Sequence, residues 1–324
     1  MKNVPDLKGM KHIGFCFDDE KLEETFMVCR KRLKESVNFD PDADTILLDS
    51  FYSAVIEGAR TTLEQVKNSL NNPKNKSDIM VINNMKALHK IYSGFPIHAG
   101  NIRKLWDVMV DGAGADCISS FDRANHGSVP YKELNRDMSA LLEFMERADM
   151  DSLYKGITAH CYVVYSHPFC NGNGSLARVL QNYCLYTGGY EGVRKIRISQ
   201  AINLHLDGYY KALKSVGTPI IFHNQTLHDL TAFIHYMLER IIEACNLSEK
   251  KRYPLSEQEK KLLTRMSKRG TGAEITVANA AVLLDVSSDK ARNVLNGLAE
   301  KRYLFKTKIE GKNKNIYKLL ILIS

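Results

Sequence analysis

The chain of 324 residues lacks the features that mark exported, membrane-spanning and zinc-binding proteins. Its N-terminus has no apolar segment of the kind that signal peptides carry, and no apolar run approaches the roughly 20 residues that a transmembrane helix needs. Its seven cysteines are odd in number and form no CxxC pair, which indicates reduced thiols rather than a disulfide framework or a zinc site. We therefore expect a cytoplasmic protein that makes no membrane contact.

Charge is unevenly distributed along the chain, although the hydrophobic content of 44% is ordinary. Residues 251–324 contain 16 Lys and Arg but 7 Asp and Glu, a net charge of +9, whereas residues 1–250 carry a net charge of −1. This change coincides with Pro254, which cannot continue a helix, and with a capping box from Ser256 to Glu259. We expect three regions, covering residues 1–75, 76–250 and 251–324.

Most of the chain before residue 251 has apolar residues at helical spacing. Helices are predicted near residues 77–92, 102–110, 131–145 and 223–246. Residues 119–130 interrupt the pattern and, taken alone, are typical of a surface loop. The predicted fold class is therefore mainly α.

The stretch from His167 to Arg178, HPFCNGNGSLAR, is the most informative part of the chain. Pro168 ends the apolar helix before it, and Gly172 and Gly174 allow successive backbone N–H groups to point to one side. Helical spacing then resumes, which predicts an anion-binding nest at a helix N-terminus. His167 is a candidate base for a hydroxyl proton, because histidine is the side chain best suited to exchange protons at physiological pH.

The same stretch resembles the signature of the Fic family, HPFx(D/E)GNGRxxR. Seven positions match in register: His167, Pro168, Phe169, Gly172, Asn173, Gly174 and Arg178. The resemblance implies transfer of AMP from ATP to a Ser, Thr or Tyr hydroxyl of a target protein, by a helical core whose loop joins two central helices. It also implies that residues 119–130 form a small β-hairpin flap, which aligns the target by strand addition.

By this resemblance, the catalytic base is His167 and the nucleotide-binding residues are Asn171, Gly172, Asn173, Gly174, Ser175 and Arg178. Asn171 stands where the family carries an acidic Mg²⁺ ligand, and Ser175 stands where it carries an arginine. A neutral amide should bind Mg²⁺ more weakly than a carboxylate, and the missing arginine removes a cation from the triphosphate's surroundings. Another phosphate or nucleotide transfer by the same fold therefore stays open as an alternative. A Cys170 nucleophile is disfavoured because acyl transfer does not need the glycines of the loop.

Ser53, Glu57 and Gly58 fit the motif SxxxE(G/N) of Fic proteins that carry an N-terminal inhibitory helix. By resemblance, Glu57 would pair with Arg178 and keep the arginine from the γ-phosphate of ATP. The physical reason is that a carboxylate held bidentately by a guanidinium excludes a phosphate. Outside this context, Glu57 would be interpreted as a helix-surface acid.

Residues 251–324 resemble a winged helix-turn-helix domain, with three expected helices before a basic hairpin. The recognition helix would span residues 288–298 and carry Lys290, Arg292 and Asn293. The wing would carry the lysines at positions 306, 308, 312 and 314. Binding of duplex DNA and docking of a protein both stay open. The DNA alternative would make the chain a regulator with a nucleotide-sensing core.

Other aromatic and histidine residues carry weaker signals. Trp106 and His160 lie on apolar helical faces and are expected in the core. His205, Tyr209 and Tyr210 follow the loop's helix, where the family architecture would allow them to line an adenine pocket.

Overall fold

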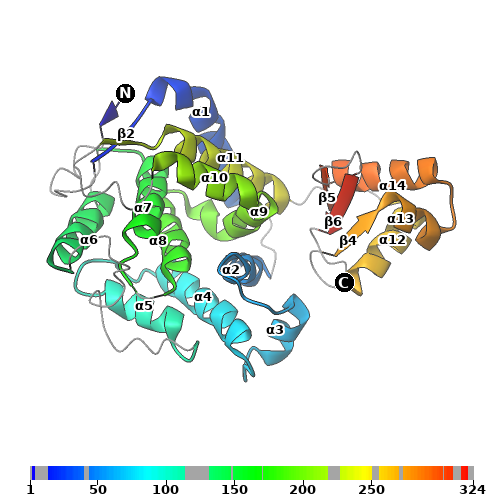
Figure 1. Ribbon diagram of the computed structural model, residues 1–324, viewed down its shortest axis with the longest axis horizontal. Helices are drawn as coiled ribbons and strands as arrows, with labels where there is room; N and C mark the ends of the chain where they lie inside the picture. The colour runs from blue at the N-terminus through cyan, green and yellow to red at the C-terminus, as the bar shows by residue number, and fades with distance from the viewer. Residues whose placement is uncertain are drawn as a thin grey trace. The chain divides into compact units, whose positions relative to one another are not determined.

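The structure is a computed structural model (Figure 1). It describes residues 2–3, 14–39, 44–113, 131–146, 149–169, 171–217, 227–249, 255–269, 273–301, 303–308 and 315–319. The chain divides into two compact units, one of Met1–Thr61 with Ser69–Glu249 and one of Thr62–Asn68 with Lys250–Ser324. Helices dominate, so the predicted mainly α class is confirmed.

Ten α-helices build the described part of the first unit. They are α1 (Asp19–Glu35), α2 (Thr45–Ile56), α4 (Lys76–Tyr92), α5 (Ile102–Val110), α6 (Tyr131–Glu146), α7 (Ser152–Ser166), α8 (Asn173–Thr187), α9 (Ile198–Leu204), α10 (Leu206–Val216) and α11 (Thr231–Ser248). Two short 3₁₀ helices, η2 (Ser36–Asn38) and η3 (Glu191–Lys195), connect them, and α3 (Leu63–Ser69) lies between α2 and α4 in the chain.

Helices α7 and α8 pack against each other at the centre of this unit. Every α7 residue except Val164 is buried, as expected of a helix that is surrounded by others. Gly156 allows the close approach, because a Cβ at this position would lie 3.1 Å from the carbonyl oxygen of Gln181 on α8. The loop between these two helices is the stretch 167–172 that contains the His-Pro-Phe motif.

Helix α2 lies on α4 and α9 and ends within the SxxxEG motif of residues 53–58. Its last residue is Ile56, and Glu57 forms its C-cap. Gly58 follows with φ of +89°, a left-handed conformation that a residue with a side chain rarely adopts. The backbone conformation of Gly58 therefore ends the helix directly after Glu57.

A small sheet that the sequence did not reveal covers one end of this unit. Its order is β1 (Lys2–Asn3), β2 (Gly14–Phe17) and β3 (Leu227–Asp229), with β2 and β3 parallel. The helix predicted from residue 223 is thus wrong at its start, since α11 begins at Thr231. At the junction of β3 and α11, the Asp229 carboxylate accepts a hydrogen bond from the Thr231 amide at 2.8 Å.

Within the described ranges, the second unit contains most of α3, three further helices and a three-stranded antiparallel sheet. After α12 (Glu257–Ser267) come β4 (Glu274–Thr276), α13 (Val277–Leu284), α14 (Ser288–Glu300), β5 (Leu304–Lys308) and β6 (Asn315–Leu319), and the strand order is β4-β6-β5. The predicted capping box of Ser256 and Glu259 is present, and so is the predicted hairpin. The sequence did not predict β4.

Several predictions fall on residues outside the described ranges. They concern the flap at 119–130, Cys170, and the lysines at 312 and 314.

The five cysteines that the structure describes are all free and buried. Within the described ranges, no helix has both the length and the apolar character that crossing a membrane requires.

Candidate active site

The loop between α7 and α8 exposes the beginning of a helix. His167 caps the end of α7 in a left-handed conformation, with φ of 47°, and its amide donates to the carbonyl of Val163. Gly172, with φ of 69°, precedes α8, and no side chain caps this helix. The first amides of α8, at Asn173 and Gly174, are therefore placed to receive an anion, as the sequence predicted.

Contacts from within the loop and from α5 fix its shape. The Asn173 side chain donates to the Phe169 carbonyl at 2.6 Å and accepts from the Phe169 amide at 2.9 Å. Trp106 on α5 stacks on the Phe169 ring at 4.7 Å, and its Nε1–H donates to the Asn171 carbonyl at 3.0 Å. Because the Asn173 side chain closes the loop, its backbone N–H is the group that it can offer to a phosphate. Trp106 is buried as expected, and it also supports the loop, which the sequence did not indicate.

His167 carries its imidazole in a defined tautomer. Its Nδ1 lies 3.0 Å from the carbonyl oxygen of Val164. A carbonyl can only accept, so Nδ1 carries the hydrogen and the lone pair of the neutral ring is on Nε2. This is the arrangement that a general base requires.

A cavity of about 250 Å³ adjoins the loop. Its polar wall comes from Glu57, Asn84, His167, Asn171, Gly172, Asn173 and Ser175, and its apolar wall from Met80, Met109, Val110 and Ala113. Ligand pockets usually have volumes of roughly 300–1,000 Å³. The cavity is therefore small for a nucleotide while Glu57 forms part of its wall.

Asn171 has the one feature of this loop that fits a metal ion. Its Oδ1 is buried and has no hydrogen-bond partner within the described ranges. An amide oxygen of this kind suits a hard cation such as Mg²⁺. The described residues contain no group of three or more His, Cys, Asp or Glu that could hold a metal.

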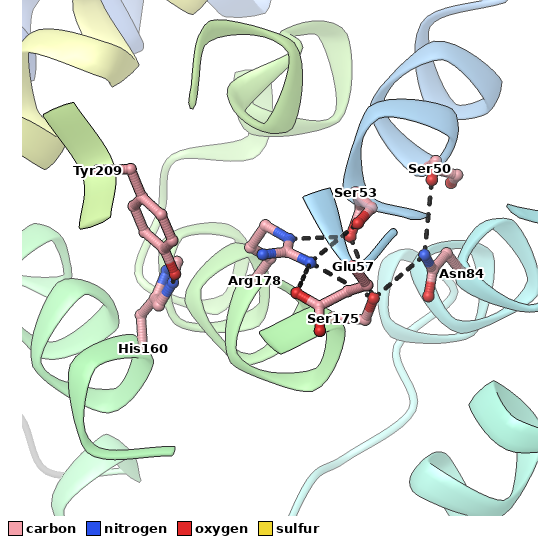
Figure 2. A network of polar contacts seen from close by, with 8 residues as sticks. All are labelled: Ser50, Ser53, Glu57, Asn84, His160, Ser175, Arg178 and Tyr209. Atoms are coloured by element: carbon pink, nitrogen blue, oxygen red, sulfur yellow. Dashed lines mark hydrogen bonds and ion pairs between the residues drawn. The ribbon is translucent and has the colours of Figure 1, made fainter. Parts of the chain in front are cut away.

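Arg178 is held by Ser53 and Glu57 of the SxxxEG motif (Figure 2). Its Nε donates to Ser53 Oγ at 2.9 Å, and its Nη2 donates to the Ser53 carbonyl at 3.0 Å and to Glu57 Oε1 at 2.9 Å. The predicted pair of Glu57 and Arg178 is therefore present. Contrary to the prediction from the sequence, the carboxylate does not bind the guanidinium bidentately, because the Nε–H of Arg178 donates to Ser53 instead. The Arg178 side chain is 3% exposed and that of Glu57 is 28% exposed, so water screens this pair only in part.

The Glu57 carboxylate also lies against the first turn of α8. A Cβ at Gly174 would lie 2.1 Å from Glu57 Oε1, so this position admits only glycine while the carboxylate is there. The carboxylate thus occupies the space beside the helix N-terminus that an anionic ligand would use. Gly174 lies inside α8 and has no positive φ, so glycine is required here by this close approach and not by the special backbone conformation that the sequence predicted.

Ser175 belongs to a buried polar network that joins three helices. Its Oγ lies 3.4 Å from both Ser53 Oγ on α2 and Arg178 Nη2. Asn84 on α4 donates to Ser175 Oγ at 3.3 Å and to the Ser50 carbonyl at 3.5 Å. Ser175 is 4% exposed, so its side chain mainly contacts protein. Sequence analysis did not identify Asn84, because nothing in a helical pattern links residues 84 and 175.

The residues considered for an adenine pocket lie in different environments. His205 pairs with Glu243 on α11 at 3.1 Å, Tyr209 is buried, and Tyr210 is 50% exposed. His160 is a core histidine, as expected, with both ring nitrogens hydrogen-bonded. Burial and the nearby charge of Arg178 lower the pKa of His160 to about 3, so its ring is neutral.

Comparison with known proteins identifies the family of the central region. Residues 73–185 match the model of the Fic/DOC family. The protein adenylyltransferase Fic of Nematostella vectensis is 27% identical over 198 residues, which cover 58% of this chain and 39% of that protein. The chain thus spans about two fifths of the length of this curated relative.

Solved structures of Fic proteins share the fold. A Fic family protein from Desulfovibrio desulfuricans G20 aligns with a TM-score of 0.56 at 17% identity, over 92% of this chain and 95% of that one. Fic-1 of C. elegans, residues 134–508, aligns with a TM-score of 0.54 at 17% identity, over 69% and 70% of the two chains. Residues 73–185 thus match the Fic/DOC family model, and the chain shares the fold of these Fic proteins.

Proposed function

We propose that this protein transfers AMP from ATP to a Ser, Thr or Tyr hydroxyl of a target protein and that Glu57 inhibits the transfer. One observation carries the proposal: His167 lines the same cavity as Gly172 and Asn173 at the N-terminus of α8, within the region that matches the Fic/DOC family. A base beside an anion nest is what attack by a hydroxyl on a phosphate requires. The adenylyltransferase named among the relatives supports AMP as the transferred group.

In the proposed reaction, Nε2 of His167 accepts the proton of the target hydroxyl. The resulting oxygen bonds to the α-phosphorus of ATP in line, and the bond from that phosphorus to the bridging oxygen of the β-phosphate breaks. AMP is then bound to the target, and pyrophosphate leaves with the electron pair of the broken bond. The amides at Gly172–Gly174 stabilise charge on the phosphates, and so does Arg178 once it is released from Glu57.

Mg²⁺ is the proposed cofactor, and Asn171 is the residue that would hold it. Its buried, unpaired Oδ1 supports this role, since an uncompensated buried acceptor is costly. When bound, Mg²⁺ would offset negative charge on the phosphate oxygens.

Inhibition by Glu57 would act on two groups at once. The carboxylate accepts a hydrogen bond from Nη2 of Arg178, and it lies where a phosphate would approach Gly174. A phosphate at this position would meet a negative charge in place of a positive one. Binding of ATP in a reactive position therefore requires Glu57 to move.

Intact-mass analysis tests the proposed activity. The Glu57→Gly protein, incubated with ATP and Mg²⁺, should add the mass of one AMP to itself or to an added target protein. The Glu57→Gly/His167→Ala protein should add nothing while it still binds ATP, because it lacks the base but retains the nest. An added phosphate in place of AMP would point to the alternative transfer. Equal AMP addition by both proteins would show that His167 is not the base.

A second proposal concerns residues 251–324. We propose that this unit is a winged helix-turn-helix domain that binds duplex DNA, with α14 as the helix that enters the groove. The net charge of +9 supports it, as does the exposure of Lys290, Arg292 and Asn293 along α14. Docking of a protein is the alternative. A DNA titration at low and at physiological salt decides between them.

A further inference from the structure

Three buried polar side chains link the two helices that flank the reactive loop to a third helix. They are His160 on α7, Gln181 on α8 and Tyr209 on α10, each at most 2% exposed. His160 Nδ1 lies 2.6 Å from Gln181 Oε1, and His160 Nε2 lies 2.8 Å from the Tyr209 hydroxyl. Figure 2 shows the Tyr209 ring reaching His160. We call these three residues the His160 trio.

The direction of each hydrogen bond follows from the chemistry of the groups. An amide oxygen only accepts, so His160 Nδ1 carries a hydrogen and donates it to Gln181. The other ring nitrogen then has the lone pair and accepts the Tyr209 hydroxyl hydrogen. The imidazole is therefore neutral and uses both nitrogens, which agrees with the lowering of its pKa to about 3.

The trio lies close to the reactive groups along both helices. His160 precedes His167, the C-cap of α7, by seven residues, almost two helical turns. Gln181 follows Arg178 by three residues, one turn along α8. Arg178 is near enough for its charge to contribute to the pKa of both His160 and Tyr209. The hydrogen bond from His160 to Gln181 thus spans from the helix that ends at His167 to the helix that carries Arg178.

Packing beside the trio restricts any shift of α7 along the axis of α8. Gly156, one turn before His160, brings α7 against the Gln181 carbonyl, where an added Cβ would lie at 3.1 Å. Phe233 of α11 closes the other side of His160, with the ring centroids 5.7 Å apart. Apolar packing tolerates small shifts along a helix axis, whereas a buried hydrogen bond of 2.6 Å fixes one register.

We infer that the His160 trio positions the catalytic groups, by fixing the register of α7 on α8 and hence the place of His167 relative to Arg178. This inference rests on the proposed transfer for its link to catalysis. The three residues are positioning residues, since none of them lines the cavity beside the loop. A neutral residue is also required at position 160, because a second cation here would repel the buried Arg178.

The test uses the full chain with Glu57→Gly as the parent. His160→Leu and Gln181→Leu each remove the hydrogen bond between α7 and α8. Each should lower kcat for AMP transfer by roughly 10- to 100-fold, because a displacement of the catalytic group by about 1 Å has an effect of this size. The dissociation constant for ATP, followed by the fluorescence of the single tryptophan, Trp106, should change little. The double variant should be no worse than either single variant, because the two residues act through one bond.

Two control variants separate positioning from stability. His160→Asn can place an N–H where Nδ1 lies and should restore most of kcat relative to His160→Leu. Leu153→Ala creates a cavity in the same helix, almost two turns before His160, and should lower the melting temperature without lowering kcat. If Leu153→Ala reduces kcat as much as His160→Leu does, or if the effects of His160→Leu and Gln181→Leu add, the inference is wrong.

A spectroscopic measurement keeps this inference distinct from the proposed function. In histidine-labelled protein, the His167 resonance can be assigned by its loss in His167→Ala. It should shift in His160→Leu and stay in place in Leu153→Ala. If the parent transfers no AMP, the proposed function fails, and the His167 resonance still decides the positioning role. An unshifted resonance in His160→Leu would overturn it.

Discussion

Asn171 places an amide oxygen at the site where the proposed reaction needs a cation. Its Oδ1 is buried without a partner in the described chain, so it can coordinate an ion but cannot offset the ion's charge. In the Glu57→Gly protein, Asn171→Asp should lower the Mg²⁺ concentration for half-maximal transfer by roughly tenfold, because it adds a negative charge in direct contact with the ion. Initial rates across a magnesium titration measure this shift.

The matched control is Asn171→Ala, which removes the oxygen and should raise the magnesium requirement. If neither substitution changes the requirement, the ion is held by other groups and the role of Asn171 is wrong.

At the residue scale, the sequence predicted features that depend only on residues close by in the chain. The left-handed backbone of Gly172 and the ring tautomer of His167 depend on neighbouring residues, so local sequence suffices to predict them. It did not predict Trp106 below the loop or Asn84 beside Ser175. These contacts join residues 65 and 91 positions apart, and only the tertiary fold brings such residues together.

At the scale of elements, Asp49 links α2 to α9. Its Oδ1 accepts the Ser199 amide in the first turn of α9 at 2.6 Å. Burial raises the pKa of Asp49 from 3.8 to about 6, although the Ser199 hydrogen bonds and the charges of Arg178 and Arg197 act in the opposite direction. The folded state therefore binds a proton more readily than the unfolded state does. The contribution of this group to stability is complete below pH 3.8 and is lost as the pH rises through about 6.

Asp49→Asn keeps an acceptor for Ser199 and removes the buried charge. At pH 7 this variant should raise the free energy of unfolding by about 1–3 kcal/mol, and the gain should shrink towards pH 5. Urea unfolding followed by Trp106 fluorescence reports on the unit that contains both residues. Asp49→Ala, which removes the acceptor, is the control and should be destabilising. A variant Asp49→Asn that is less stable than wild type at pH 7 would contradict this account.

Periodicity predicted the long elements and missed the short ones. Helices α4, α5 and α6 lie within one or two residues of their predicted limits, because each has a clear apolar face. Strand β2 has four residues, of which Phe15, Cys16 and Phe17 are all buried, so it lacks the alternation that marks a strand. Strands β3 and β4 have three residues each, too few to show a period.

At the scale of the whole molecule, the basic charge and the Fic-family domain lie in different parts of the chain. If the second unit binds DNA, the full-length protein should bind mixed duplexes with a log–log salt slope of about −0.9 per neutralised phosphate. Lys290→Gln should weaken binding to all sequences alike, whereas Arg292→Gln should relax sequence preference if Arg292 reaches a base edge. Fluorescence anisotropy at two salt concentrations measures both effects.

Lys260→Gln is the matched control for this experiment. Lys260 is exposed in the same unit but lies on α12, where it pairs with Glu257. Its substitution removes the same charge and should have the smaller effect. Absence of binding even at low salt would favour the protein-docking alternative.

The central claim is that Glu57 restrains the site by holding Arg178 and covering Gly174. The most direct measurement is the initial rate of AMP transfer for four proteins: wild type, Glu57→Gly, Arg178→Ala and the double variant. Releasing a charge-assisted hydrogen bond worth ~1.5–3 kcal/mol should make Glu57→Gly roughly 10- to 100-fold faster than wild type. Both proteins with Arg178→Ala should remain slow, because the gain depends on the freed guanidinium. Equal rates for wild type and Glu57→Gly would contradict the account.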